Sequence, residues 1–99
     1  MARSRYNIFH GDTTPYFVTA TTINWLPLFS NPAIVHILID SLNFLQRHDR
    51  LKLIAYVIME NHIHLIAFAQ ELAKELSDFK SYTARKSIDY YQQRGNEFI

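Results

Sequence analysis

Two apolar, β-type runs separated by only two residues constrain the fold of this chain more than any other feature. Residues 51–59 are almost continuously apolar, and residues 62–68 follow directly after the polar pair Glu60 and Asn61. Short apolar runs of this kind are typical of strands, and a two-residue polar break leaves room only for a tight turn. The pattern predicts an antiparallel hairpin in which residues 51–59 form a central, covered strand.

The remaining periodicity places one strand and one helix before this hairpin and one helix after it. Residues 15–22 are aromatic and β-branched, which favours a strand. Asn31 and Pro32 are good N-cap and first-turn residues for a helix, and apolar residues recur at helical spacing from there to residues 46–50. A second helical pattern runs from residue 71 to about residue 93.

This element order, β-α-β-β-α, predicts an α+β fold of the ferredoxin-like type that lacks its last strand. Residues 96–99 are too few to supply that strand, so we expect a single domain over residues 1–99 that is incomplete at its C-terminal end. A small core and an open sheet edge both favour a homodimer.

Composition excludes several classes of protein. The 99 residues contain no cysteine, which removes disulfide scaffolds and thiolate metal sites. No apolar stretch is long enough for a signal peptide or a membrane span, so we expect a cytoplasmic protein without a membrane partner. The net charge of +1 leaves nucleic-acid binding to local clusters of Lys and Arg.

The triplet His62-Ile63-His64 is the strongest candidate for chemistry. Side chains at positions i and i+2 of a strand leave the same face, so both imidazoles can point at one divalent ion while Ile63 packs the other way. The alternative is that the two histidines are simply half-buried or solvated strand residues. His36 and His48 belong to the first helical segment, and we expect neither to be a ligand.

Around this triplet the sequence resembles a known family. The segments YVIMENHIHLI (residues 56–66) and FKSYTAR (residues 79–85), together with the strand segment YFVT (residues 16–19), resemble the single-tyrosine HUH transposases, including the REP-associated tyrosine transposases. The resemblance covers nearly the whole chain. One position departs from it, because the family usually has proline where this chain has Glu60. That change places an additional carboxylate near the imidazoles.

The resemblance implies a metal-dependent DNA endonuclease and strand transferase that acts on single-stranded or hairpin DNA. It also implies that His62 and His64 hold Mg²⁺ or Mn²⁺, and that the protein works as a homodimer. Since such hard ions prefer oxygen ligands, we expect a third protein ligand. The family's nucleophilic tyrosine lies on a helix after the fourth strand, and we expect it beyond Ile99. Tyr82, Tyr90 and Tyr91 precede that region, and we expect Tyr90 to be a core residue.

Four residues of the second helical segment are candidates for DNA contact, because cations bind phosphates and an aromatic ring can stack on an unpaired base. They are Lys80, Tyr82, Arg85 and Lys86. A solvated helix face explains the same residues, and Asp78 and Asp89 dilute their positive field.

Two other functions remain open at this level. A non-catalytic ferredoxin-like module would bind nucleic acid or a partner chain through its sheet edge and basic helix, whether or not a metal is present. A small metal sensor would use the same two imidazoles to bind Zn²⁺ or Ni²⁺ without responding to DNA.

Overall fold

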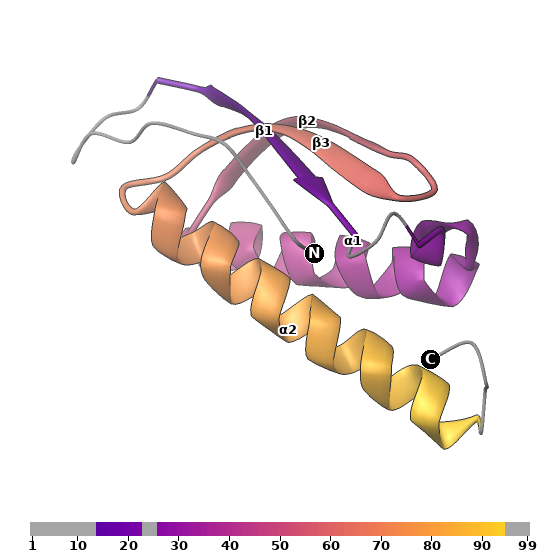
Figure 1. Ribbon diagram of the computed structural model, residues 1–99. Coiled ribbons are helices and arrows are strands. Elements are labelled where there is room, and N and C mark those ends of the chain that lie inside the picture. Colours follow the sequence, from indigo (N-terminus) through magenta and orange to yellow (C-terminus); the bar gives the residue numbers. More distant parts are fainter. Residues whose placement is uncertain (1–13, 23–25, 95–99) are drawn as a thin grey trace.

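The computed structural model describes residues 14–22 and 26–94, which form one three-stranded sheet with two helices packed on one side (Figure 1). The elements are β1 (Tyr16–Thr21), the short 3₁₀ turn η2 (Leu28–Ser30), α1 (Pro32–Arg47), β2 (Lys52–Ile58), β3 (His62–Phe68) and α2 (Leu72–Gln93). The fold is α+β, and its order β-α-β-β-α is compatible with a ferredoxin-like arrangement, as the sequence predicts.

The sheet is antiparallel with the strand order β1-β3-β2, so the predicted hairpin of β2 and β3 is confirmed. The prediction that the first apolar run is a central strand is wrong. β2 is an edge strand, and β3 lies between it and β1. Ile54 and Val57 of β2 are about half exposed. An apolar run shows only that its own side chains are apolar. The position of a strand in the sheet depends on which neighbour β1 pairs with, and here β1 pairs with β3.

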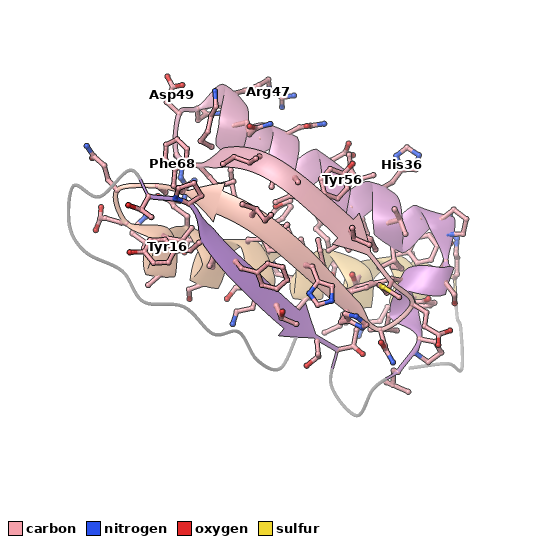
Figure 2. The ribbon with its side chains drawn as sticks, turned by 90° about the horizontal axis from the view of Figure 1, so that it is seen from above. Tyr16, His36, Arg47, Asp49, Tyr56 and Phe68 are labelled. Atoms are coloured by element: carbon pink, nitrogen blue, oxygen red, sulfur yellow. The ribbon has the colours of Figure 1, made fainter. Side chains whose placement is uncertain are left out.

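The core lies between the sheet and the helices. Ile63, Leu65 and Ala67 of β3 are buried on the side that faces the helices. Helical residues at heptad-like spacing complete this core, chiefly Ile34, Leu38, Leu42, Leu45, Leu72, Leu76 and Phe79. Because side chains alternate along a strand, the other residues of β3 lie on the opposite face. No helix among the described residues covers that face, which Figure 2 views from above.

Both ends of α1 are fixed by local hydrogen bonds. Asn31 is the N-cap, and its side-chain oxygen accepts from the backbone N–H of Ala33 at 2.9 Å, as the sequence predicts. At the other end Asp49 has a φ of 54°, and the amide of Arg50 donates to the carbonyl of Leu45 at 2.9 Å. This is a Schellman-type ending, in which Asp49 takes the left-handed position usually held by glycine.

A cluster of charges joins the turn before β2 to α2. The guanidinium of Arg50 lies 2.7 Å from the carboxylate of the buried Glu75 and 2.8 Å from that of Asp78. Lys74 lies 3.3 Å from the same Asp78 oxygen. The hydrogen bond from Arg50 to Glu75 is the largest cause that raises the pKa of Arg50 above its usual value. Arg50 therefore neutralises Glu75, the carboxylate that is buried among the described residues.

The inner side of α2 differs from the sequence prediction at one residue. Tyr91 is buried, and its hydroxyl accepts from the amide of Asn31 at 3.2 Å, whereas Tyr90 is only half-buried and stacks beneath Arg94. The prediction that Tyr90 belongs to the core is confirmed in part, because Tyr90 packs against the core while it stays partly exposed. The helical phase at this end of α2 turns Tyr91 fully inward. α2 has 22 residues, yet no helix in the described part of the chain is apolar enough to cross a membrane.

Candidate functional site

His62 and His64 lie on the uncovered face of β3, at the end next to the hairpin turn. Both side chains are partly exposed, while Ile63 between them is fully buried in the core. In the pairing of the strands, Thr21 of β1 is opposite His62, and Thr19 is opposite His64. The structure thus has the two imidazoles on one face, as strand alternation predicts.

The two rings adopt a geometry that suits a shared ion. Their centroids are 4.7 Å apart and their planes are nearly perpendicular, at 83°. When two imidazole nitrogens bind one ion at about 2.1 Å with a right angle between the bonds, the ring centroids lie about 4.6 Å apart. The observed centroid separation is compatible with two neighbouring positions of an octahedral ion, and an edge-to-face contact between two rings gives the same separation.

Each ring also has a neutral hydrogen-bonding partner at Nδ1. Oδ1 of Asn61 lies 2.8 Å from Nδ1 of His62, and Oγ1 of Thr19 lies 3.0 Å from Nδ1 of His64. These contacts occupy Nδ1 of each ring and leave Nε2 as the nitrogen that an ion could bind. Sequence reasoning missed both partners. The pairing register that brings Thr19 to His64 cannot be read from the chain, whereas Asn61 directly precedes the histidine that it contacts.

A third ligand is not found in the described part of the chain. No group of three or more His, Cys, Asp or Glu side chains there is arranged to hold a metal. Glu60 is exposed in the hairpin turn and does not join the two histidines in such a group, although the sequence suggests a carboxylate near them. The two imidazoles therefore leave most positions of an octahedral ion to water, substrate oxygens or residues outside the described ranges.

Exposed apolar side chains lie beside His64. The ring of Phe17 lies 5.4 Å from that of His64, and 62% of Phe17 is exposed. Val57, the β2 residue opposite His64, is also more than half exposed. No charged side chain pairs across the sheet with either histidine. Contiguous exposed apolar surface is typical of sites that bind another molecule.

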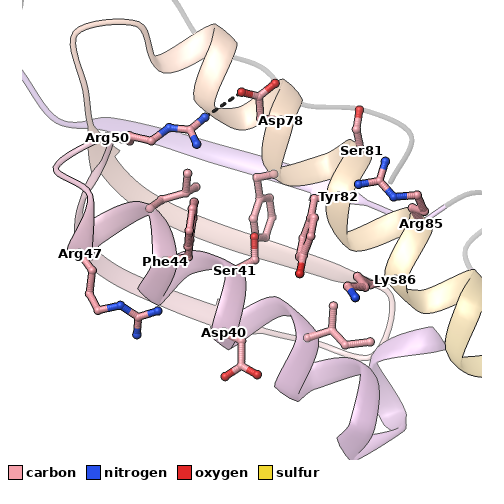
Figure 3. Close-up of a pocket in the computed structure, with 13 residues that line it drawn as sticks. Asp40, Ser41, Phe44, Arg47, Arg50, Asp78, Ser81, Tyr82, Arg85 and Lys86 are labelled. Atoms are coloured by element: carbon pink, nitrogen blue, oxygen red, sulfur yellow. Dashed lines mark hydrogen bonds and ion pairs between the residues drawn. The ribbon is translucent and has the colours of Figure 1, made fainter.

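A second feature is a groove of about 910 Å³ between α1 and α2 (Figure 3). The buried residues Leu45 and Phe79 contribute to its lining. Two partly exposed rings, those of Phe44 from α1 and Tyr82 from α2, stand between the helices in Figure 3. The groove thus presents aromatic surface within an otherwise polar helix layer.

Cations surround this groove. Arg47, Arg85 and Lys86 line it and form no ion pair with any described residue, whereas Arg50 is held by Glu75 and Asp78. Arg85 and Lys86 each lie 5.8 Å from the ring centroid of Tyr82, within the range of a cation–π contact. Asp40 and Asp78 are the acidic residues of the lining, so the groove carries an excess of positive charge.

Three of the four predicted DNA-contact residues therefore come together, and one does not. Tyr82, Arg85 and Lys86 line the groove, but Lys80 is absent from its lining. Residues two apart on a helix face different directions, which separates Lys80 from Tyr82. Phe44 and Arg47 of α1 join the cluster, and sequence reasoning missed them because nothing in the chain shows which face of α1 meets α2.

The two features lie on opposite sides of the molecule. The histidines are on the sheet face that no described helix covers, and the groove runs between the helices that cover the other face (Figures 1 and 3). A short DNA strand therefore cannot contact the histidines and the groove of one chain at the same time unless it passes around the edge of the sheet.

Comparisons of the chain with protein-family models, with curated proteins and with solved structures return no match. The resemblance to the HUH transposases therefore rests on the motif residues alone.

Proposed function

We propose that this chain is a metal-dependent DNA-processing domain of the single-tyrosine HUH type, in which His62 and His64 bind one divalent ion, Mg²⁺ or Mn²⁺. The observation that carries the proposal is the pair of imidazoles at 4.7 Å on one open sheet face, each with its Nδ1 occupied by a neutral partner. The motif around the pair supports the same function.

An ion bound by these histidines would supply positive charge for the nonbridging oxygens of a scissile phosphate. The chain's own part is to hold both imidazoles on one strand, each with a neutral partner at Nδ1. Because no carboxylate of the described residues joins the two histidines in a metal-binding group, a DNA phosphate can itself complete the ligand sphere. The nucleophilic tyrosine that the resemblance implies is not assigned to any residue of this chain.

We propose single-stranded or hairpin DNA as the substrate, with part of it held in the helix groove. Free cations at Arg47, Arg85 and Lys86 suit phosphates, and the ring of Tyr82 offers a face on which an unpaired base can stack. Since the groove and the histidines lie on opposite sides, the groove serves as an anchor rather than as part of the metal site.

We further propose that the protein works as a homodimer. The edge strand β2, with its half-exposed Ile54, provides backbone groups and apolar surface for a second copy. Light scattering at micromolar concentration should give twice the mass of the chain. The mass of a single chain would contradict the dimer without affecting the metal site.

Binding of a labelled DNA hairpin with a single-stranded tail tests the function. Fluorescence anisotropy with and without Mn²⁺ should show tighter binding in Mn²⁺, and His62→Ala with His64→Ala should remove that gain. His36→Ala is the matched control, because His36 is an exposed histidine on α1 (Figure 2). If Mn²⁺ has no effect on the native chain, the metal-dependent function is wrong.

The second candidate is a non-catalytic nucleic-acid-binding module, and the groove's unpaired cations favour it specifically. It predicts DNA binding that is equal with and without Mn²⁺ and that survives loss of both histidines. The same anisotropy experiment separates the two functions.

A further inference from the structure

We infer that Asn61 and Thr19 are positioning residues that hold His62 and His64 as Nδ1–H tautomers and so present Nε2 of both rings to the same ion. The inference rests on the proposed metal site and adds the groups that prepare it. It follows from two hydrogen bonds, from the strand pairing and from the anchoring of the hairpin turn.

The partner of His62 sets its tautomer directly. Oδ1 of Asn61 has no proton, so at 2.8 Å it must accept from Nδ1–H of His62. In a neutral imidazole the other nitrogen, Nε2, then carries the lone pair that binds a metal. Replacing the amide with an alanine side chain would free the ring to take either tautomer and to rotate.

The position of Asn61 is itself fixed by the backbone. The carbonyl of Asn61 accepts from the amide of Thr22 at 2.9 Å, and the carbonyl of Glu60 accepts from the amide of Phe29 at 2.9 Å. The hairpin turn is therefore tied both to the chain just after β1 and to η2. A turn held at both of its residues keeps the Asn61 side chain aimed at His62.

The partner of His64 comes from the neighbouring strand. Thr19 and His64 are opposite each other in the β1–β3 pairing, and Oγ1 lies 3.0 Å from Nδ1. A hydroxyl can donate or accept, and only an accepting Thr19 leaves Nε2 of His64 unprotonated. The ring of Phe17 lies 5.4 Å from that of His64, tilted by 44°. Outer partners of this kind typically change metal affinity by about 10- to 100-fold.

The test combines a tautomer readout with a metal readout on the full chain. Two-bond ¹H–¹⁵N correlation spectra in slightly alkaline solution, where free imidazole is neutral, report which ring nitrogen carries the proton. In the metal-free native chain we expect the Nδ1–H form for both rings. Asn61→Ala should mix the tautomers of His62 alone, and Thr19→Val should do so for His64 alone. Each variant should weaken Mn²⁺ binding by about tenfold or more.

Matched variants separate positioning from a general loss of structure. Thr19→Ser keeps the hydroxyl and should restore both readouts. Thr21 is the threonine opposite His62 in the β1–β3 pairing. The Thr21 side chain makes no hydrogen bond with any described residue, so Thr21→Val should change neither readout. Backbone amide spectra confirm that each variant is folded.

The outcomes distinguish this inference from the proposed function. An Nε2–H tautomer of either ring in the native chain, or unchanged Mn²⁺ affinity in both Asn61→Ala and Thr19→Val, overturns the inference and leaves the metal site standing. A native chain that binds no Mn²⁺ overturns the proposed function instead, and the tautomer spectra then decide whether Asn61 and Thr19 fix the two rings.

Discussion

Asn31 and Tyr91 join the first turn of α1 to the last turn of α2, with Nδ2 of Asn31 donating to the tyrosine hydroxyl at 3.2 Å. The same asparagine caps α1 through its side-chain oxygen. One side chain thus caps the beginning of α1 and ties together two segments that are 60 residues apart.

This double role predicts a larger cost at Asn31 than at another asparagine of the region. Asn31→Ala should lower the free energy of unfolding by about 1–2 kcal/mol, because a cap and a hydrogen bond are lost together. Asn43→Ala, at an exposed position within α1, should change it by less than about 0.5 kcal/mol. Urea denaturation measures both. Tyr91→Phe should cost less in the Asn31→Ala background than alone, and equal costs would show that the two residues are not coupled.

The two faces of the sheet should respond differently to truncation. Leu65→Ala removes a side chain that is 2% exposed and should cost about 2–5 kcal/mol, since it leaves a cavity in the core. Val57→Ala, on the uncovered face of the edge strand, should cost less than about 1 kcal/mol. Thermal unfolding followed by circular dichroism measures both. A large effect of Val57→Ala at a concentration where the chain is monomeric would mean that this face is covered.

The charge cluster at Arg50 should stabilise the fold unequally through its members. Arg50→Ala leaves the buried Glu75 without its cation, so it should lower the melting temperature more than Lys74→Ala, which breaks only an exposed pair. The pKa of Arg50 is raised on folding. The contribution of Arg50 to stability is therefore complete below its pKa in the unfolded chain. It is lost only as the pH rises through the higher pKa of the folded chain, which lies at strongly alkaline pH.

The Arg50→Ala effect should consequently stay present across the whole neutral range. Melting curves at several values between about pH 6 and pH 9 check this, because no titration of Arg50 falls in that window. An effect that vanished at the upper end of the window would assign the stabilisation to another group.

The helix groove predicts a change in the salt dependence of DNA binding. Arg85→Ala and Lys86→Ala should each reduce the slope of log K against log salt by about 0.7 on single-stranded DNA, the contribution of one phosphate contact. Lys52→Ala, an exposed cation on β2, should leave the slope unchanged. Anisotropy titrations at several salt concentrations give the slopes. Equal slopes for the native chain and both groove variants would remove the groove from the DNA path.

The sequence carries the elements of this fold but not their arrangement. Alternation and helical spacing predict β1, α1, the β2–β3 hairpin and α2 nearly to the residue, because these patterns depend on nearest neighbours. The edge position of β2 and the burial of Tyr91 instead depend on how distant segments meet. No local pattern contains that information.

The candidate site divides in the same way. The shared face of His62 and His64 follows from strand alternation and is correctly predicted. Thr19 at His64, Phe44 at the groove and the separation of Lys80 from Tyr82 all depend on packing between elements. Asn61 alone of the missed residues had a local signal, since it directly precedes the histidine that it contacts.

The coordination of Mn²⁺ by the native chain tests the central claim most directly. Pulsed electron paramagnetic resonance detects nitrogen nuclei bound to Mn²⁺, and the account predicts one ion per chain with two imidazole nitrogens. His64→Ala should leave one nitrogen, and His36→Ala should leave both. Mn²⁺ bound without nitrogen coupling, or with coupling that survives loss of both His62 and His64, would contradict the account.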